Sequence, residues 1–197
     1  YHTLPGLAVP AFLLVPRGLR GTAPAVLCPP GHGHGMRQLM DEEPGIYKQY
    51  PRELARRGFV VLVPEHAGFG ERADRAGGDT HSFLAHALAL QGRSWIGLVV
   101  RELMRAVDVL RGLPEVDPRR VGCFGLSLGG ESTLYLSALD ARIAAAVISG
   151  FVTSFRSTFL AEPHCSCGYS FAVARWFEHG DIASLIAPRP VLVERGT

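Results

Sequence analysis

Five consecutive apolar residues, Phe59–Val63, lie between Gly58 and Pro64. A strand covered on one face alternates apolar and polar residues, whereas an unbroken apolar run of this length is typical of a strand buried on both faces of a parallel sheet. Parallel strands need a crossover connection, normally a helix, between them. This run therefore favours an α/β domain with a mostly parallel sheet and helices on both of its faces.

The rest of the chain alternates in the same way between apolar runs and helical segments. The clearest helix covers Trp95–Arg111, where apolar residues recur every three or four positions until Gly112 and Pro114 end the pattern. Strands are also predicted at Leu7–Val15, Ala25–Cys28, Arg120–Gly125, Ile143–Ser149 and Val191–Glu194, and helices at Tyr47–Arg57, Leu128–Leu139 and Asp181–Ile186.

Three further expectations complete this outline. Asp181 is predicted to be the N-cap of the short helix that it begins. Two stretches, Glu65–Gln91 and Phe151–Glu178, are predicted to be long irregular connections, which in such a sheet often carry function. With no internal repeat and no low-complexity linker, residues 1–197 are predicted to form a single α/β domain.

Composition argues against several classes of protein. The 197 residues are 47% hydrophobic and 19% charged, which is enough apolar surface for a core and too much for a disordered chain. No apolar run approaches the roughly 18–20 residues that span a bilayer, and a net charge of +2 is too small for a nucleic-acid surface. We therefore expect an enzyme domain with a small-molecule partner, no cofactor, no nucleic acid and no membrane.

Four cysteines are too few for a disulfide scaffold at this length. Their sparse, uneven spacing weakly favours the cytoplasm, although a chain that begins at Tyr1 shows no natural start from which a signal peptide could be read. Nothing in the sequence specifies an oligomeric state.

The segment Gly125-Leu126-Ser127-Leu128-Gly129 has the form G-x-S-x-G, with an apolar strand before it and a helix rich in small residues after it. A serine on such a turn projects its hydroxyl from the edge of the sheet, next to a helix N-terminus whose amides can stabilise an oxyanion. Ser127 is therefore predicted to be a nucleophile, with the amide of Leu128 as an oxyanion donor. The alternative is a glycine-rich turn whose serine only caps the helix.

A second glycine-rich segment, Cys28–Gly35, follows an earlier strand. Turns at this position present backbone N–H groups to the nucleophile, so the amide of His32 is predicted to complete the oxyanion hole with Leu128. The alternative is a glycine turn with two solvated histidines, His32 and His34. A metal site formed by these two histidines has no nearby carboxylate pattern to support it.

These segments resemble the α/β-hydrolase family, in particular its dienelactone-hydrolase-like and acetyl-xylan-esterase-like branch. The resemblance runs over most of the chain and extends to Pro64–Glu71, Val116–Val121, Ala138–Ile143 and Ala187–Leu192. It implies a serine esterase in which Ser127 attacks an ester carbonyl to form an acyl-enzyme, a histidine is the base and an acid orients the histidine.

The family order is serine, then acid, then histidine. The acid would lie in a segment like G-x-x-D that begins at Gly196-Thr197, so both the acid and the histidine are expected beyond Thr197. On this interpretation the chain is a fragment that lacks the last strand and helices of the fold. Glu194, Asp181, His164 and His179 are weaker substitutes, and a non-catalytic or inactive α/β-hydrolase-like domain is the alternative function.

Other groups leave more than one interpretation open. The run His164-Cys165-Ser166-Cys167 is predicted to be structural or to line a pocket, because three ligands within four residues suit a tetrahedral metal poorly; zinc and redox roles are the alternatives. No metal site is predicted. Loop residues, namely His66, Glu71, His81 and His86, either line a pocket or are solvated, and the aromatic residues of Phe151–Phe177 form core or a substrate wall.

Overall fold

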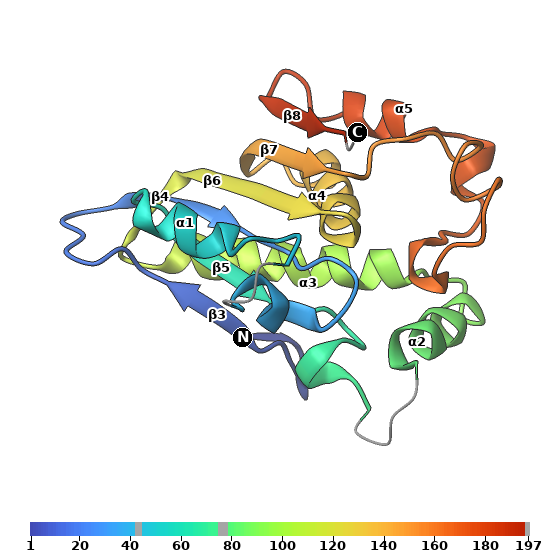
Figure 1. Ribbon diagram of the computed structural model, residues 1–197, viewed down its shortest axis with the longest axis horizontal. Coiled ribbons are helices and arrows are strands. Elements are labelled where there is room, and N and C mark those ends of the chain that lie inside the picture. Colours follow the sequence, from blue (N-terminus) through green and yellow to red (C-terminus); the bar gives the residue numbers. More distant parts are fainter. Residues whose placement is uncertain (42–44, 75–78, 196–197) are drawn as a thin grey trace.

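The computed structural model describes residues 1–41, 45–74 and 79–195 and has a six-stranded sheet at its centre (Figure 1). The strand order is β3-β5-β4-β6-β7-β8, in which β3 is antiparallel to β5 and every other pair is parallel. The strands are β3 (Ala11–Leu14), β4 (Ala23–Leu27), β5 (Val60–Pro64), β6 (Val116–Leu126), β7 (Ile143–Ser149) and β8 (Val191–Glu194). A separate hairpin pairs β1 (His2–Leu4) with β2 (Leu7–Ala8).

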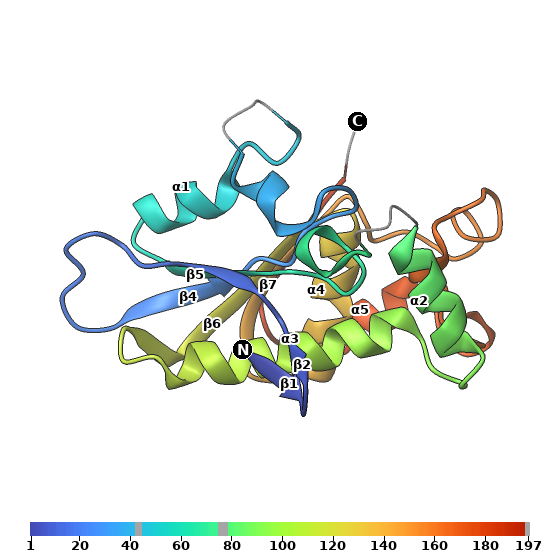
Figure 2. The same ribbon diagram turned by 90° about the horizontal axis from the view of Figure 1, so that it is seen from below.

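Helices cover both faces of this sheet, as Figure 2 shows, with α1 on one face and α3 and α4 on the other. The α-helices are α1 (Tyr50–Arg56), α2 (Thr80–Ala89), α3 (Trp95–Gly112), α4 (Leu128–Leu139) and α5 (His179–Ser184). Short 3₁₀ helices are η1 (Gly35–Leu39), η2 (Gly70–Arg72), η3 (Ser166–Gly168) and η4 (Val173–Arg175). In the described residues, no helix is both long and apolar enough to cross a membrane.

The apolar run that predicts a parallel sheet is the most deeply buried strand. All five residues of β5 are buried, between β3 on one side and β4 on the other. The stripe of α3 is buried as its periodicity predicts, with Trp95, Val99 and Leu103 at 0–1% exposure against the sheet. The prediction of a mostly parallel α/β sheet is therefore confirmed. By contrast, all four residues of β8 are exposed.

Three predicted elements are wrong in detail. The strand predicted over Leu7–Val15 is divided into β2 and β3 at Val9 and Pro10, where proline has no N–H for a ladder. Asp181 is not an N-cap: α5 begins at His179, and the Asp181 carboxylate accepts a hydrogen bond of 2.8 Å from the amide of Glu178, the actual N-cap residue.

The stretch Glu65–Gln91, predicted to be irregular, contains η2 and α2. In α2 only Ala85 is buried, while Phe83 is 70% exposed, so the helix lacks the clean apolar stripe that reveals α3. The start of α2 does have a sequence signal, which is an N-cap residue. The Asp79 side chain accepts a hydrogen bond of 3.1 Å from the amide of Ser82.

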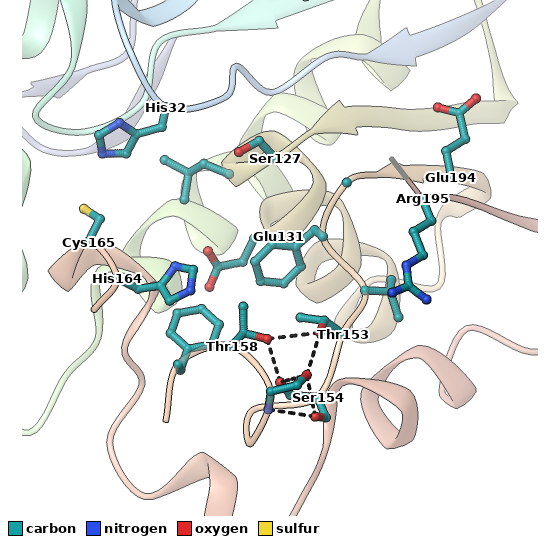
Figure 3. Close-up of a pocket in the computed structure, with 17 residues that line it drawn as sticks. His32, Ser127, Glu131, Thr153, Ser154, Thr158, His164, Cys165, Glu194 and Arg195 are labelled. Atoms are coloured by element: carbon teal, nitrogen blue, oxygen red, sulfur yellow. Dashed lines mark hydrogen bonds between the residues drawn. The ribbon is translucent and has the colours of Figure 1, made fainter. Parts of the chain in front are cut away.

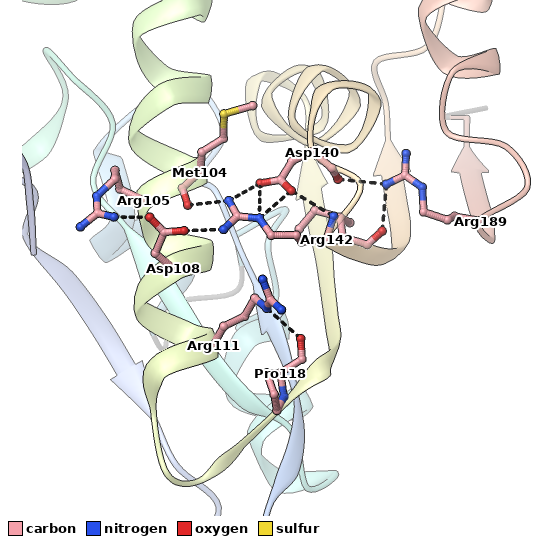
Figure 4. Close-up of polar contacts among 9 residues, drawn as sticks. Met104, Arg105, Asp108, Arg111, Pro118, Asp140, Arg142 and Arg189 are labelled. Carbon is pink, nitrogen blue, oxygen red and sulfur yellow. Dashed lines mark hydrogen bonds and ion pairs between the residues drawn. The ribbon is translucent and has the colours of Figure 1, made fainter.

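A network of arginines fixes the end of α4 against its neighbours (Figure 4). Arg142 pairs with Asp140, at the C-cap of α4, and with Asp108 on α3. Arg189, just before β8, donates hydrogen bonds of 2.7–3.0 Å to the carbonyl oxygens of Ser137, Asp140 and Ile143. Carbonyl oxygens at a helix C-terminus have no hydrogen-bond partner in their own helix, and Arg189 donates to those at the end of α4. The same contacts hold the start of β8 beside β7.

A second ion pair is almost completely buried. The guanidinium of Arg72 in η2 donates two hydrogen bonds of 2.7 Å to the carboxylate of Glu102 on α3, and the two side chains are 10% and 4% exposed. This bidentate contact ties the loop after β5 to the long helix.

We expect the substitution Glu102→Ala to lower the free energy of unfolding by about 3–5 kcal/mol, because it leaves a buried guanidinium without its anionic partner. Urea denaturation of the wild type and the variant measures this difference. Glu53→Ala, which removes the surface pairs with Arg56 and Arg57, is the matched control and should have a much smaller effect. Equal effects of the two substitutions would contradict the assignment.

Candidate active site

Ser127 lies on the sharp turn between β6 and α4, in a backbone conformation that non-glycine residues rarely adopt, with φ 58° and ψ −121°. Two hydrogen bonds of 2.9 Å hold it there, from its amide to the carbonyl of Ser149 and from the amide of Glu131 to its own carbonyl. The neighbouring structure therefore forces the serine into this geometry.

The two glycines of the motif are required by close packing. A Cβ at Gly125 would lie 2.0 Å from the carbonyl oxygen of Gly129. A Cβ at Gly129 would lie 2.3 Å from the carbonyl oxygen of Pro29, in the glycine-rich segment after β4. No side chain fits at either position, and the second contact brings that segment directly against the start of α4.

Ser127 and Leu128 border a cavity of about 680 Å³ at the carboxyl end of the parallel strands (Figure 3). His32 and Cys165 lie on one side of this cavity, and Glu194 and Arg195 lie on the opposite side. The remaining wall comes from α4, through Glu131, and from the segment that follows β7. Such a crevice beyond the carboxyl ends of the strands is where open α/β sheets bind ligands.

The predicted oxyanion donors both lie at this cavity. Leu128 is the first residue of α4, a position whose N–H has no partner in its own helix. Gly31, immediately before His32, packs so closely that a Cβ would lie 2.0 Å from the Tyr47 hydroxyl and 2.9 Å from the carbonyl oxygen of Leu126. The chain at His32 is thereby held next to the end of β6.

The four residues considered as acid or base within the chain include three whose positions bear on the cavity. His164 lines the cavity with its ring against Phe159, whereas His179 is fully buried, hydrogen-bonded through Nδ1 to the carbonyl of Thr153 at 2.8 Å. Glu194 ends β8 and lines the cavity. Within the described part of the chain, the Ser127 hydroxyl makes no hydrogen bond to any of them. Gly196 and Thr197, where the acid segment is expected to begin, lie outside the described residues.

Glu131 is a buried acid at the cavity that sequence analysis missed. It lies one turn after Ser127 on α4, and among the described residues its Oε1 has no hydrogen-bond partner. Burial, and to a smaller extent the negative charge of Cys165, raise the pKa of this carboxyl to about 8. Glu131 therefore carries a proton at neutral pH.

Two histidines and two cysteines from distant parts of the sequence meet beside the cavity. One ligand atom each from His32, His81, Cys165 and Cys167 lies within 4.8 Å of all the others. The run His164–Cys167 thus does not act as one unit, since His164 is not part of this cluster.

Hydrogen bonds with Cys167 and His32 lower the pKa of the Cys165 thiol, and the contact with Cys165 raises the pKa of the Cys167 thiol. In the described chain, these residues are the group suited to hold a metal ion.

The other loop residues have separate roles. His66 is buried against Trp95 and does not line the cavity, so neither alternative considered from the sequence is right for it. Glu71 pairs with Arg37 at 2.6 Å on the surface, and His86 contacts the Ser166 hydroxyl at 3.0 Å.

The aromatic residues after β7 divide between core and surface. Phe155 and Phe159 are buried, Phe151 and Phe159 line the cavity, and Trp176 and Phe177 are 74% and 53% exposed. The core interpretation is therefore correct for Phe155 and Phe159 and wrong for Trp176 and Phe177.

The fold and this site define an α/β hydrolase. Residues 1–197 match the abhydrolase family, and the chain belongs to it. The chain is 31% identical over 193 residues to YtaP of Bacillus subtilis, described as a candidate hydrolase, and covers 62% of that protein. It is 31% identical over 135 residues (64% of this chain) to the acetyl esterase Axe7A of Xylanibacter ruminicola and covers 29% of it. The chain thus spans less than two thirds of either relative.

Solved structures show the same fold. A Bacteroides fragilis protein described as a candidate acetyl xylan esterase superposes with a TM-score of 0.86 at 20% identity, over 98% of this chain and 57% of that one. The methylesterase BT1017 gives a TM-score of 0.68 at 26% identity, over 95% and 39%. The predicted α/β-hydrolase fold is therefore confirmed, and the esterases among these similar proteins are consistent with the branch that the sequence resembles.

The backbone strain at Ser127 leads to a stability test. Glycine adopts a positive φ without the steric penalty of a Cβ, so we expect Ser127→Gly to be more stable than Ser127→Ala by about 1 kcal/mol. The same pair of substitutions at Ser137, inside α4, should give the opposite order, because glycine destabilises a helix interior. Thermal or urea unfolding of the four variants measures both differences; the same order at both positions would contradict the strained geometry.

The buried His66 leads to a pH test. Burial, with a smaller contribution from the positive charge of Arg72, lowers the pKa of His66 to about 3. Between that value and the ordinary pKa near 6.5, the unfolded chain binds a proton that the native chain does not, so stability falls as pH falls. Relative to His66→Gln, the wild type should lose about 2 kcal/mol of unfolding free energy between pH 7 and pH 5.

Urea denaturation at the two pH values measures this difference. Ser132→Ala is the control, because it removes the hydroxyl 3.3 Å from Nε2 and keeps the imidazole. It should retain the wild-type pH dependence. A His66→Gln variant with the same dependence as the wild type would contradict the assignment.

Proposed function

We propose that the protein is a serine esterase that hydrolyses small carboxylic esters through an acyl-enzyme on Ser127. The observation that carries this proposal is the strained turn at Ser127, which opens onto the cavity at the carboxyl edge of the sheet. Strain of this kind persists only where the surrounding structure over-determines it, and it clusters at active sites. A serine that only capped α4 would need no positive φ, and the Ser127 side chain makes no cap hydrogen bond.

In this mechanism the Ser127 oxygen attacks the ester carbonyl while its proton passes to a base. The carbonyl oxygen becomes an oxyanion, and the amides of Leu128 and His32 are the proposed donors that stabilise it. The intermediate then expels the alcohol, which leaves with the proton, and the acyl group stays on Ser127. Water attacks this ester in the second half of the reaction, releasing the carboxylic acid and restoring the serine.

The base and the acid of the triad are proposed to come from residues beyond Thr197. Two observations support this assignment. The Ser127 hydroxyl has no hydrogen bond to a described residue, and His179, with its Nδ1 on a carbonyl and its ring among phenylalanines, is suited to the core. The family order, in which acid and histidine follow the serine, agrees with it.

Hydroxyl side chains on the cavity wall suggest the nature of the alcohol. Thr153, Ser154, Ser157 and Thr158 line the cavity and contact one another at 2.8–3.1 Å (Figure 3). Hydroxyls both donate and accept hydrogen bonds, so this wall suits an alcohol with several hydroxyls of its own, such as a sugar. The acetyl esterase Axe7A among the relatives supports a small acyl group.

The test uses the full-length protein with a fluorophosphonate and with an acetylated xylo-oligosaccharide. We expect one covalent adduct by intact mass, and hydrolysis that Ser127→Ala reduces at least about a thousandfold, because the nucleophile is lost. Ser154→Ala, at another hydroxyl of the cavity, should keep the adduct. Activity that survives in Ser127→Ala would refute the proposal. Neither adduct nor hydrolysis by folded wild-type protein would favour the alternative, a non-catalytic domain.

A further inference from the structure

The cluster beside the cavity has the composition and the size of a single-ion site. Nε2 of His32 lies 3.0 Å from Nε2 of His81, which lies 3.0 Å from Sγ of Cys165, and this sulfur lies 2.8 Å from Sγ of Cys167. Ligands about 2.1 Å (nitrogen) and 2.3 Å (sulfur) from a tetrahedral zinc ion are about 3.4–3.8 Å apart, so a small expansion would admit the ion. We propose that His32, His81, Cys165 and Cys167 bind one zinc ion.

A carboxylate orients one of the two histidines. Nδ1 of His81 lies 2.7 Å from a carboxylate oxygen of Asp79, a contact that in the neutral ring places the proton on Nδ1 and leaves the lone pair on Nε2. That lone pair faces both the His32 ring and the Cys165 sulfur at 3.0 Å, and it cannot accept good hydrogen bonds from both. A cation between the three atoms satisfies all of them. A carboxylate behind a metal-binding histidine is a common feature of zinc sites.

The two sulfurs supply the charge that zinc needs. Cys165 and Cys167 are free thiols whose 2.8 Å separation exceeds the roughly 2.05 Å of a disulfide bond. Both sulfurs bind zinc as thiolates, and two thiolates balance the charge of one Zn²⁺. A neutral complex of this kind fits a site in which Cys167 is buried and Cys165 and His81 are half-buried.

Aromatic packing holds the histidine rings in place. Phe69 stacks on the His81 ring at 4.4 Å between centroids and meets the His32 ring edge-on at 5.2 Å. Ser166, between the two cysteines, contacts His86 one turn further along α2. The donors are thus oriented by their surroundings before any ion binds, which lowers the entropy lost on binding.

Four protein ligands leave no open position, so the ion has a structural role. It would join three segments: the loop after β4, the first turn of α2, and η3 in the segment after β7. His32 and Cys165 also line the cavity, so the ion would fix one wall of it. Any effect of the ion on the His32 amide as an oxyanion donor rests on the proposed esterase function, whereas zinc binding itself does not.

The experiment measures metal in the full-length protein, purified without a metal-affinity tag and loaded with zinc sulfate. Elemental analysis after gel filtration should give about one zinc per chain, and below about 0.1 for the double variant Cys165→Ser/Cys167→Ser and for His81→Ala. His34→Ala, in the same loop as His32 but outside the cluster, is the matched control and should keep the ion. Ser127→Ala should also keep it, which separates this proposal from the catalytic one.

Cobalt provides a readout that does not depend on the folding of a variant. Wild-type protein loaded with Co²⁺ should show the intense ligand-field bands of a tetrahedral site and a thiolate-to-cobalt charge-transfer band. Wild-type protein that takes up no stoichiometric zinc and gives no such bands would overturn the proposal. Metal that persists in the double serine variant, or a Cys165–Cys167 disulfide in protein isolated under mild reduction, would overturn it as well.

Discussion

The contact between Gly129 and Pro29 is the constraint on which the arrangement of the site depends. Here the start of α4 and the segment after β4 approach until no Cβ fits between them. The parallel sheet makes this possible, because β4 and β6 are neighbours whose carboxyl ends meet at one edge. Ser127 and His32 are 95 positions apart in sequence, yet this contact places both at one cavity.

Polar groups around this edge are partnered or kept neutral, because charge without a partner is expensive in a buried environment. Arg72 has Glu102, burial keeps His66 without a proton, and burial keeps Glu131 with one. These buried side chains therefore place no unpartnered charge next to the cavity, whose own charged side chains Glu194 and Arg195 lie on the side opposite His32.

Local patterns were sufficient to predict the sheet, α3, α4 and the turn at Ser127. Each depends on residues within a few positions: the apolar run of β5, the stripe of α3, and glycines two positions to either side of a serine. The sequence does not indicate α2, because most of its residues stay partly exposed. The N-cap assignment of Asp181 fails because this residue lies in the first turn of α5, where its carboxylate accepts a hydrogen bond from the amide of Glu178. No pattern of neighbouring residues predicts the pairing of Arg72 with Glu102 or the burial of Glu131, because both follow from how helices pack on the sheet.

The cluster of His32, His81, Cys165 and Cys167 could not be predicted from residues that are close in sequence. Three possible ligands within four residues suit a tetrahedral ion poorly, and no carboxylate pattern near His32 and His34 supports a metal site. In the structure His164 and His34 lie outside the cluster, and His32 from the loop after β4 and His81 from α2 join the two cysteines. With the proposed zinc ion, the segment at His32 is constrained twice, by the backbone contact at Gly129 on one side and by side-chain ligation on the other. A loop fixed from both sides can hold an amide donor in place without reorganisation, which is the condition for strong stabilisation of a transition state.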